Sequence, residues 1–280
     1  MIDLAVLQFL AAPFAASLIL TGIHAYLGVH VVERGVIFVD LSLAQIAAFG
    51  ATVALVLPGA AVDPHSDFVY FVSVSFTLVG AAIFSLVRMR QSRIPQEAII
   101  GIAYAVASGA TILAMSHSTS QAEHLKDMLV GNIIAVGWPE VIKTAVLYGA
   151  IGVFHYVFRR TFLAISMDPE GSEARGVPIR FWDFLFYASF GFVVTSSVAI
   201  AGVLLVFCYL IVPSVAAMMY ADRIGPRLAI GWTMGTLVSA LGIYLSLLFD
   251  LPTGATIVCT FGLVLVLMGA VRPMLRGRAA

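Results

Sequence analysis

Three polar residues interrupt the apolar stretch GVIFVDLSLAQIAAFG, and each could contact a cation through oxygen: Asp40, Ser42 and Gln45. In a helix, Ser42 and Gln45 share a face because they are three residues apart. Asp40 and Gln45 are five residues apart and diverge by about 140°. In a functional interpretation these residues line a pathway through a membrane, where the neutral amide of Gln45 suits transient contact with an ion that must also leave.

A structural interpretation of the same residues is equally open. Ser42 and Gln45 would then hydrogen-bond between helices, packed by small residues such as Ala44. Gln45 is expected ~13 Å into the span, near its middle, and Asp40 only ~6 Å. Asp40 could therefore reach the interface, or pair with Arg34 or with a neighbouring span. Each of these would avoid much of the ~3 kcal/mol that an acid at the membrane centre costs.

Other polar residues also lie within or beside apolar runs. For His24 we favour a pathway role over a purely structural one. Asp250 begins DLPTG, where proline and glycine break the chain and Thr253 can cap the next helix. Two interpretations of Asp250 are equally open: it forms a simple turn, or it is an acid of an outer vestibule. Interfacial positions are expected for His30, His155 and Asp183.

The composition indicates a helical membrane protein with many spans. Hydrophobic residues make up 61% of the 280 residues, charged residues 11%, and the mean hydropathy is +1.04. A soluble domain carries about 25% charged residues. The net charge of zero and the lack of a basic stripe give no sign of a nucleic-acid partner. Cys208 and Cys259 lie in apolar runs and are expected to be small buried hydrophobes, not a disulfide or metal pair.

Nine apolar runs approach the ~20 residues that a membrane-spanning helix needs. They lie near 5–31, 36–58, 68–87, 98–116, 139–158, 181–200, 202–221, 228–249 and 256–271. Gly202 is the obvious break inside 181–221, so eight spans with one broken helix is the alternative. Because backbone exposed to lipid must be bonded internally, we predict an all-α fold, with residues 1–280 as a single transmembrane domain. The first span follows no basic segment and is expected to be retained.

The basic residues predict the orientation. Thirteen of the fifteen Lys and Arg residues fall on one side if nine spans are present, and Lys126 and Lys143 fall on the other. Basic residues gather on the cytoplasmic side, so we place the C-terminus in the cytoplasm and the N-terminus outside. Segment 128–140 is too short to cross and is expected to be interfacial or re-entrant. We interpret the outward loops as solvated loops in preference to a cation site, although they contain Asp63, His65, Asp67, His117, Glu123, His124 and Asp127.

One cytoplasmic loop, at about 161–180, predicts a short capped helix. In SMDPEGSEARGVPIRFW, Asp168 can serve as the N-cap and Pro169 as the first helical residue, while Gly176 ends the helix. A short helix lying across the cytoplasmic face is what a membrane subunit needs to receive force from a soluble motor. The alternative is a capped connector without a partner.

The same loop carries a resemblance. DPEGSEARGVP resembles the coupling helix of ABC importer permeases, through Glu170, Glu173, Ala174 and Gly176. The segments 28–50, 201–217 and 248–267 are similar to segments of the zinc/manganese-type ABC transporter permeases, in the same order. The resemblance covers nearly the whole chain.

This resemblance implies a complete machine. The fold would be that of a type II ABC importer, like the vitamin B12 permease, in the inner membrane of a bacterium. Two copies would pair with two ATP-binding subunits and receive the ion from an extracytoplasmic metal-binding protein. The cargo would be a divalent transition metal ion, zinc or manganese, or iron, with no permanently bound cofactor. The chain has no G-x-x-x-x-G-K-[ST] phosphate loop, so hydrolysis of ATP would fall to the partner and this chain would not be an enzyme.

The chain departs from the family at one place. Members carry Asp-x-x-x-His in the second span, and this pattern falls on Leu41 and Gln45 here. A high-affinity zinc site is therefore not expected at this position. Two other functions are considered: a permease for an iron chelate or a cobalamin-like vitamin, and an ion-coupled secondary transporter. The latter predicts two similar halves, and no convincing repeat relates 1–140 to 141–280.

Overall fold

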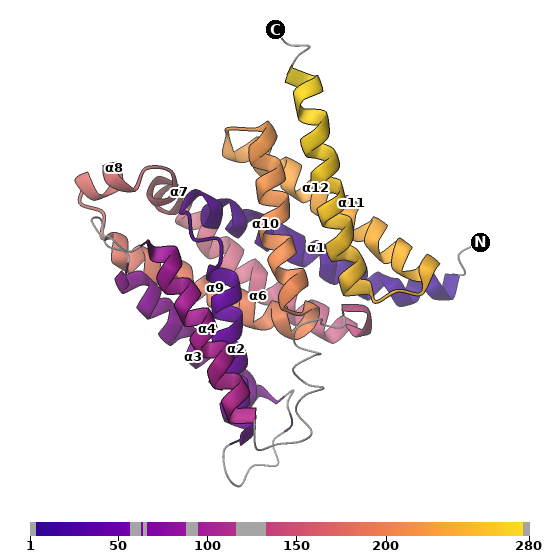
Figure 1. Cartoon of the computed structure of the whole chain (residues 1–280), viewed down its shortest axis with the longest axis horizontal. Helices are drawn as coiled ribbons and strands as arrows, with labels where there is room; N and C mark the ends of the chain where they lie inside the picture. Colours follow the sequence, from indigo (N-terminus) through magenta and orange to yellow (C-terminus); the bar gives the residue numbers. More distant parts are fainter. Residues whose placement is uncertain (1–3, 57–62, 64–65, 88–94, 116–132, 277–280) are drawn as a thin grey trace. The chain divides into compact units, whose positions relative to one another are not determined.

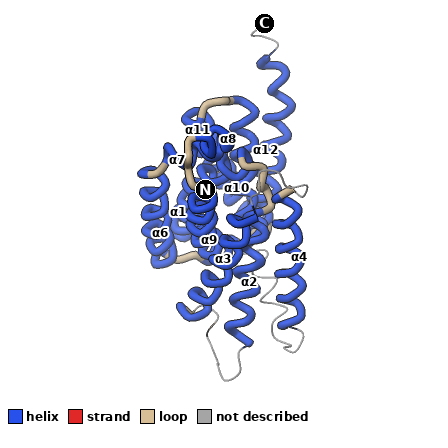
Figure 2. Tube along the Cα trace, turned by 90° about the vertical axis from the view of Figure 1, so that its left-hand side faces the viewer, coloured by secondary structure: helices blue, strands red, loops and turns tan. Residues whose placement is uncertain are grey.

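The computed structural model describes residues 4–56, 63, 66–87, 95–115 and 133–276. Within these ranges the chain is helical and contains no strand, and short loops join its helices (Figure 2). The predicted all-α fold is confirmed. Several residues of the expected outward loops lie outside the described ranges: His65, His117, Glu123, His124 and Asp127. Asp63 and Asp67 are described and exposed.

The helices follow one another along the chain in the colour order of Figure 1. Their bounds are α1 Leu4–Glu33, α2 Val39–Val56, α3 Asp67–Val87, α4 Gln96–Met115, the 3-10 turn η1 Ile133–Ala135, α6 Trp138–Val157, α7 Arg159–Met167, α8 Pro169–Ala174, α9 Ile179–Ala201, α10 Val203–Tyr220, α11 Ile224–Phe249 and α12 Thr253–Arg276. Among the described residues, eight helices are long and apolar enough to cross a membrane. The pair α6–α7 makes a ninth if it counts as one span.

The break at Gly202 occurs where it was predicted, and it separates two spans, as the nine-span prediction had it. Gly202 has φ 75° and ψ 161°, a backbone conformation that residues other than glycine rarely adopt. Both α9 and α10 are long and apolar enough to cross by themselves. The bent element is instead α6–α7, with an angle of 73°. Arg159 and Arg160 open α7, and two arginines are poorly suited to continue a helix into hydrocarbon.

The described helices form two compact units. The first contains Met1–Val32, Leu129–Gly152 and Ile200–Ala280, and the second contains Glu33–Met128 and Val153–Ala199. In the first unit α10, α11 and α12 pack on one another. The start of the predicted interfacial segment lies outside the described ranges, and its end forms η1 and the beginning of α6.

In the first unit, α1 packs against α10 and α11. A Cβ at Gly28 would lie 2.0 Å from the carbonyl oxygen of Leu210, so the two backbones approach as closely as a glycine allows. On α11, the Trp232 indole N–H donates to the Gly22 carbonyl over 3.0 Å. The Tyr209 hydroxyl then joins α10 to α11 through Ser239 over 2.8 Å.

In the second unit, α2 packs on both α3 and α4, and the three helices run side by side (Figure 1). A Cβ at Gly50 would lie 3.0 Å from the Phe76 side chain, so a small residue sets the approach of α2 to α3. The hydroxyl groups of Thr77 and Thr195 lie 3.1 Å apart and join α3 to α9. Helix α2, which carries the polar residues of interest, is therefore packed on more than one side.

Candidate functional site

The N-terminal end of α2 is held by a carboxylate from another helix. Glu97 in the first turn of α4 accepts a hydrogen bond from the Phe38 backbone N–H over 3.0 Å. A negative charge near the N-terminal end of α2 also interacts favourably with the positive end of its helix dipole. The sequence did not point to this contact, which joins residues 59 positions apart.

Asp40 and Ser42 lie buried on α2 at 1% and 0% exposure. Neither Asp40 Oδ1 nor Ser42 Oγ has a hydrogen-bond partner among the residues that the structure describes. Of the alternatives considered for Asp40, pairing with Arg34 is not observed, because the Arg34 guanidinium binds Asp183. A buried carboxylate without a partner is costly, so the packing of this helix gives no structural reason for an acid at position 40.

Gln45 is also buried, at 6% exposure. Two small residues of the same helix, Ala44 and Ala48, are buried as well. The structural interpretation requires Ser42 and Gln45 to bond between helices. For Ser42 no such bond is found, because its Oγ has no hydrogen-bond partner within the described residues.

His24 and Asp250 belong to the first unit and are described there. His24 is fully buried, its Nδ1 donates to the Leu20 carbonyl over 2.9 Å, and its ring meets Tyr148 edge-on. Asp250 is exposed and ends α11 with a left-handed φ of 51°. Beneath it Ser246 Oγ lies 2.7 Å from Thr253 Oγ1. The geometry of Asp250 is thus that of a turn between α11 and α12.

The predicted cytoplasmic helix forms as α8. Asp168 Oδ1 accepts a hydrogen bond from the Gly171 N–H over 2.9 Å, Pro169 is the first helical residue and Gly176 follows with φ 77°. The residues expected to meet a partner are exposed. They are Asp168, Glu170, Glu173, Ala174 and Gly176.

Sequence reasoning missed a buried cluster around Arg34. The Arg34 guanidinium donates to Asp183 on α9 and to Ser166 on α7. Asp183 is 0% exposed and is the fifth residue of α9, so it is buried against protein near the end of its span. His155 is 1% exposed and hydrogen-bonds Ser189 over 2.9 Å. Arg34 and Asp183 carry opposite charges, but no spacing in the sequence links the two residues.

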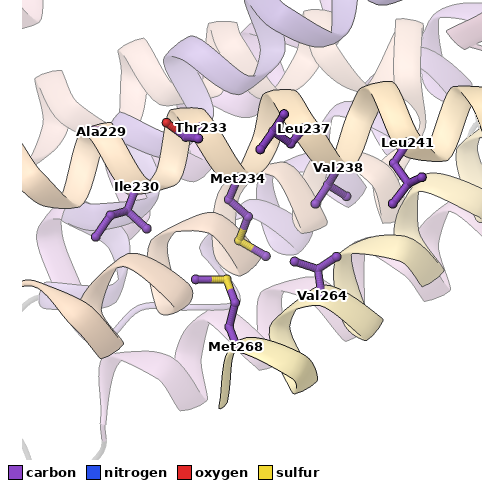
Figure 3. A pocket seen from close by; sticks show the side chains of 9 residues that line it. All are labelled: Ala229, Ile230, Thr233, Met234, Leu237, Val238, Leu241, Val264 and Met268. Carbon is purple, nitrogen blue, oxygen red and sulfur yellow. The ribbon is translucent and has the colours of Figure 1, made fainter. Parts of the chain in front are cut away.

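An apolar groove of about 550 Å³ lies between α11 and α12 (Figure 3). Met234 and Met268 face each other across it, and Thr233 supplies the single hydroxyl in its lining. A lining without carboxylate or imidazole suits hydrocarbon and not a divalent ion of the manganese or zinc kind. Neither Cys208 nor Cys259 forms a disulfide, and both are more exposed than the sequence suggested because they lie on partly uncovered helix faces.

No three His, Cys, Asp or Glu side chains gather within the described residues in a way that could hold a metal ion.

Residues 6–272 match the family model described as the ABC 3 transport family. The chain belongs to this family. It is 27% identical over 203 residues to the manganese transport system membrane protein MntC of Listeria innocua, covering 72% of each chain. It is 26% identical over 204 residues to the chelated iron transport system membrane protein YfeC of Yersinia pestis, covering 72% of this chain and 69% of YfeC.

A solved structure shares the fold. The structure of PsaBC from Streptococcus pneumoniae in complex with Fab matches with a TM-score of 0.77 and 22% identity, covering 93% of this chain and 91% of that one. This likeness agrees with the importer-permease architecture that the sequence led us to expect. The family membership and the apolar helices make the chain a multi-pass membrane protein of a transport system.

Proposed function

We propose that the chain is the membrane-spanning permease subunit of a bacterial ABC importer that moves a divalent transition metal ion inward. The observation that carries the proposal is the match of residues 6–272 to the ABC 3 transport family. The relatives named for manganese and chelated iron support a metal as the cargo. The buried oxygens of α2 supply groups that an ion in passage could contact.

Manganese is the cargo we favour. Asp40, Ser42 and Gln45 offer carboxylate, hydroxyl and amide oxygens, which suit manganese. Imidazole, which suits zinc, is missing at position 45. Zinc and iron are the alternatives, and competition among the three free ions in an uptake assay distinguishes them.

The partners follow from the same proposal. Two copies of the chain form the path, two ATP-binding subunits supply the energy, and an extracytoplasmic binding protein delivers the ion. The exposed residues of α8 form the surface on which an ATP-binding subunit docks. The C-terminus lies in the cytoplasm together with α8, as the distribution of basic residues predicts.

The test uses the chain purified together with its native ATP-binding partner and reconstituted in lipid vesicles with the binding protein. We expect uptake of manganese that requires ATP and is reduced by excess unlabelled manganese. Purification of the chain without any ATPase subunit, or uptake that continues without ATP, would contradict the proposal.

Chelated iron is the second candidate, because YfeC is named for it. If the cargo is a chelate, an iron chelate will compete with labelled substrate and free manganese will not. The reverse result excludes the chelate.

A further inference from the structure

The second unit contains a buried polar cluster that the proposed function leaves unused: Arg34, Ser166 and Asp183, which we call the Arg34 cluster. We propose that the Arg34 cluster is the link through which movement of α8 reaches α2 and α9. The three residues are positioning residues and do not contact the ion. The inference rests on the proposed function, since it assumes that an ATP-binding subunit pushes on α8.

The geometry of the cluster fixes three chain segments at one point. Arg34 Nη1 donates to Asp183 Oδ1 over 2.6 Å, and Arg34 Nε donates to Ser166 Oγ over 2.9 Å. The Arg34 Cζ also lies 4.1 Å from the centre of the Phe186 ring. A guanidinium is planar and rigid, so contacts made by different edges and by its face define a single arrangement of the segments around it.

The three segments that meet at the Arg34 cluster connect α8, where the ATP-binding subunit is proposed to push, to α2, which carries the candidate pathway residues. Ser166 is the next-to-last residue of α7 and stands two positions before Asp168, the N-cap of α8. Arg34 lies in the turn that ends α1 and stands five positions before Val39, the first residue of α2. Asp183 lies near the start of α9. A displacement of α8 is therefore carried through few rotatable bonds to the beginning of α2.

Aromatic packing makes α7 a rigid part of this route. Phe162 on α7 stacks on His155 with 4.5 Å between ring centres and meets Trp182 edge-on at 5.5 Å. Because His155 lies on α6 and Trp182 on α9, α7 is held by both neighbours. A packed, buried contact switches between discrete arrangements and does not deform gradually. Such a contact can therefore transmit a displacement from one helix to the next.

Stability by itself is a weak reason for the cluster. The Arg34 and Asp183 side chains are 1% and 0% exposed. Removing two charges from water offsets most of what their attraction gains, so apolar residues could fill the same space equally well. What apolar residues cannot supply is a directional contact that ties the end of α7 to the turn before α2.

The test measures how much manganese is taken up for each ATP hydrolysed, in vesicles that contain the chain with its native ATP-binding partner and binding protein. In Ser166→Ala the Arg34–Asp183 pair remains and the bond to α7 is lost. We expect ATP hydrolysis close to that of the wild type and uptake per ATP lower by about tenfold, the size of effect that loss of one hydrogen bond to a charged group gives.

Ser85→Ala is the matched control. Ser85 is another buried serine of the same unit, and its hydroxyl donates to the Ala82 carbonyl of its own helix. Ser85→Ala should leave uptake per ATP unchanged. Ser166→Thr keeps a hydroxyl group and should restore coupling.

Arg34→Lys is the second variant of the coupling test, used if Ser166→Ala does not accumulate in the membrane. A lysine keeps a positive charge beside Asp183, but its single ammonium group cannot reproduce the planar guanidinium that binds Asp183 and Ser166 together. We therefore expect the same loss of coupling. Wild-type coupling in Ser166→Ala or Arg34→Lys overturns the inference, as does a parallel fall of hydrolysis, uptake and thermal stability. If the wild type shows no ATP-driven uptake, the proposed function is wrong, and the inference, which depends on it, is wrong as well.

Discussion

Asp40 is a buried carboxyl group on α2 whose Oδ1 has no hydrogen-bond partner among the described residues. An acid in such a place lowers stability, and neighbouring apolar residues show that the helix packs well without polar groups. The same applies to the hydroxyl of Ser42. Groups that the fold does not need are the best candidates for contact with a moving ion.

The substitution Asp40→Asn tests this at the level of one atom. It keeps the shape and removes the charge, so thermal unfolding in detergent should not occur at a lower temperature. Manganese uptake should fall by about tenfold, because a charged contact to the ion is lost. Asp222→Asn, at an exposed acid between α10 and α11, is the control and should change neither measurement. Normal uptake by Asp40→Asn would assign Asp40 a structural role.

Gln45→His places an imidazole where relatives of the chain were expected to carry one. Imidazole is a better ligand for zinc than an amide oxygen. We expect the ratio of zinc to manganese uptake to rise in Gln45→His, and both rates to fall in Gln45→Ala. The rates are measured with both ions in the same vesicles. An unchanged ratio in Gln45→His would show that Gln45 does not face the path.

The residues of α2 could be found from the sequence and the Arg34 cluster could not. Depth within a span is counted along one helix, so Asp40, Ser42 and Gln45 stand out as polar residues in an apolar run. Arg34 and Asp183 are 149 positions apart, and a single sequence contains no pattern that pairs them. The pairing of Arg34 with Asp40 was suggested by their closeness along the chain, whereas Arg34 binds the distant Asp183.

Helix α8 shows how an element is specified by local contacts. Its N-cap, first proline and terminal glycine lie within nine residues, and each acts on the backbone beside it. For this reason its start and end were predictable. The bend of α6–α7 has a local signal in Arg159 and Arg160, but its angle was not predicted. At the bend Phe158 and Phe162 also pack against Trp182 on α9, a contact between distant parts of the chain.

Gly171→Ala tests the cap of α8. A Cβ at Gly171 would lie 2.0 Å from Asp168 Oδ2, so the capping carboxylate must move and about 1 kcal/mol of helix stability is lost. We expect less ATP-binding subunit to copurify with the chain. Gly225→Ala is the control, since a Cβ at Gly225 meets no atom within 4 Å. Equal copurification in both variants would argue against docking on α8.

For the whole molecule, the number and class of the helices were predictable because about 20 apolar residues are needed to cross a membrane. The ends of most predicted spans agree with the helices, as at 68–87 and Asp67–Val87. The distribution of basic residues predicts the orientation, and the orientation determines on which side of the membrane α8 lies.

The orientation is tested with single cysteines in a chain whose Cys208 and Cys259 are replaced by serine. Glu173→Cys lies on α8 and Leu251→Cys lies in the turn after α11, and both native side chains are exposed. A thiol reagent that cannot cross membranes should label Leu251→Cys in intact cells, and Glu173→Cys only after permeabilisation. The opposite pattern would reverse the topology and remove α8 from the cytoplasm.

Gly202 has a consequence for the tolerance of the chain to random mutation. At φ 75° and ψ 161° the backbone between α9 and α10 is open to glycine and closed to almost every other amino acid. A library that samples all substitutions should therefore lose nearly every variant at position 202, even though this residue carries no polar side chain. A geneticist who reads such a map would find an apparent active-site residue where the only requirement is the freedom of the peptide chain to turn.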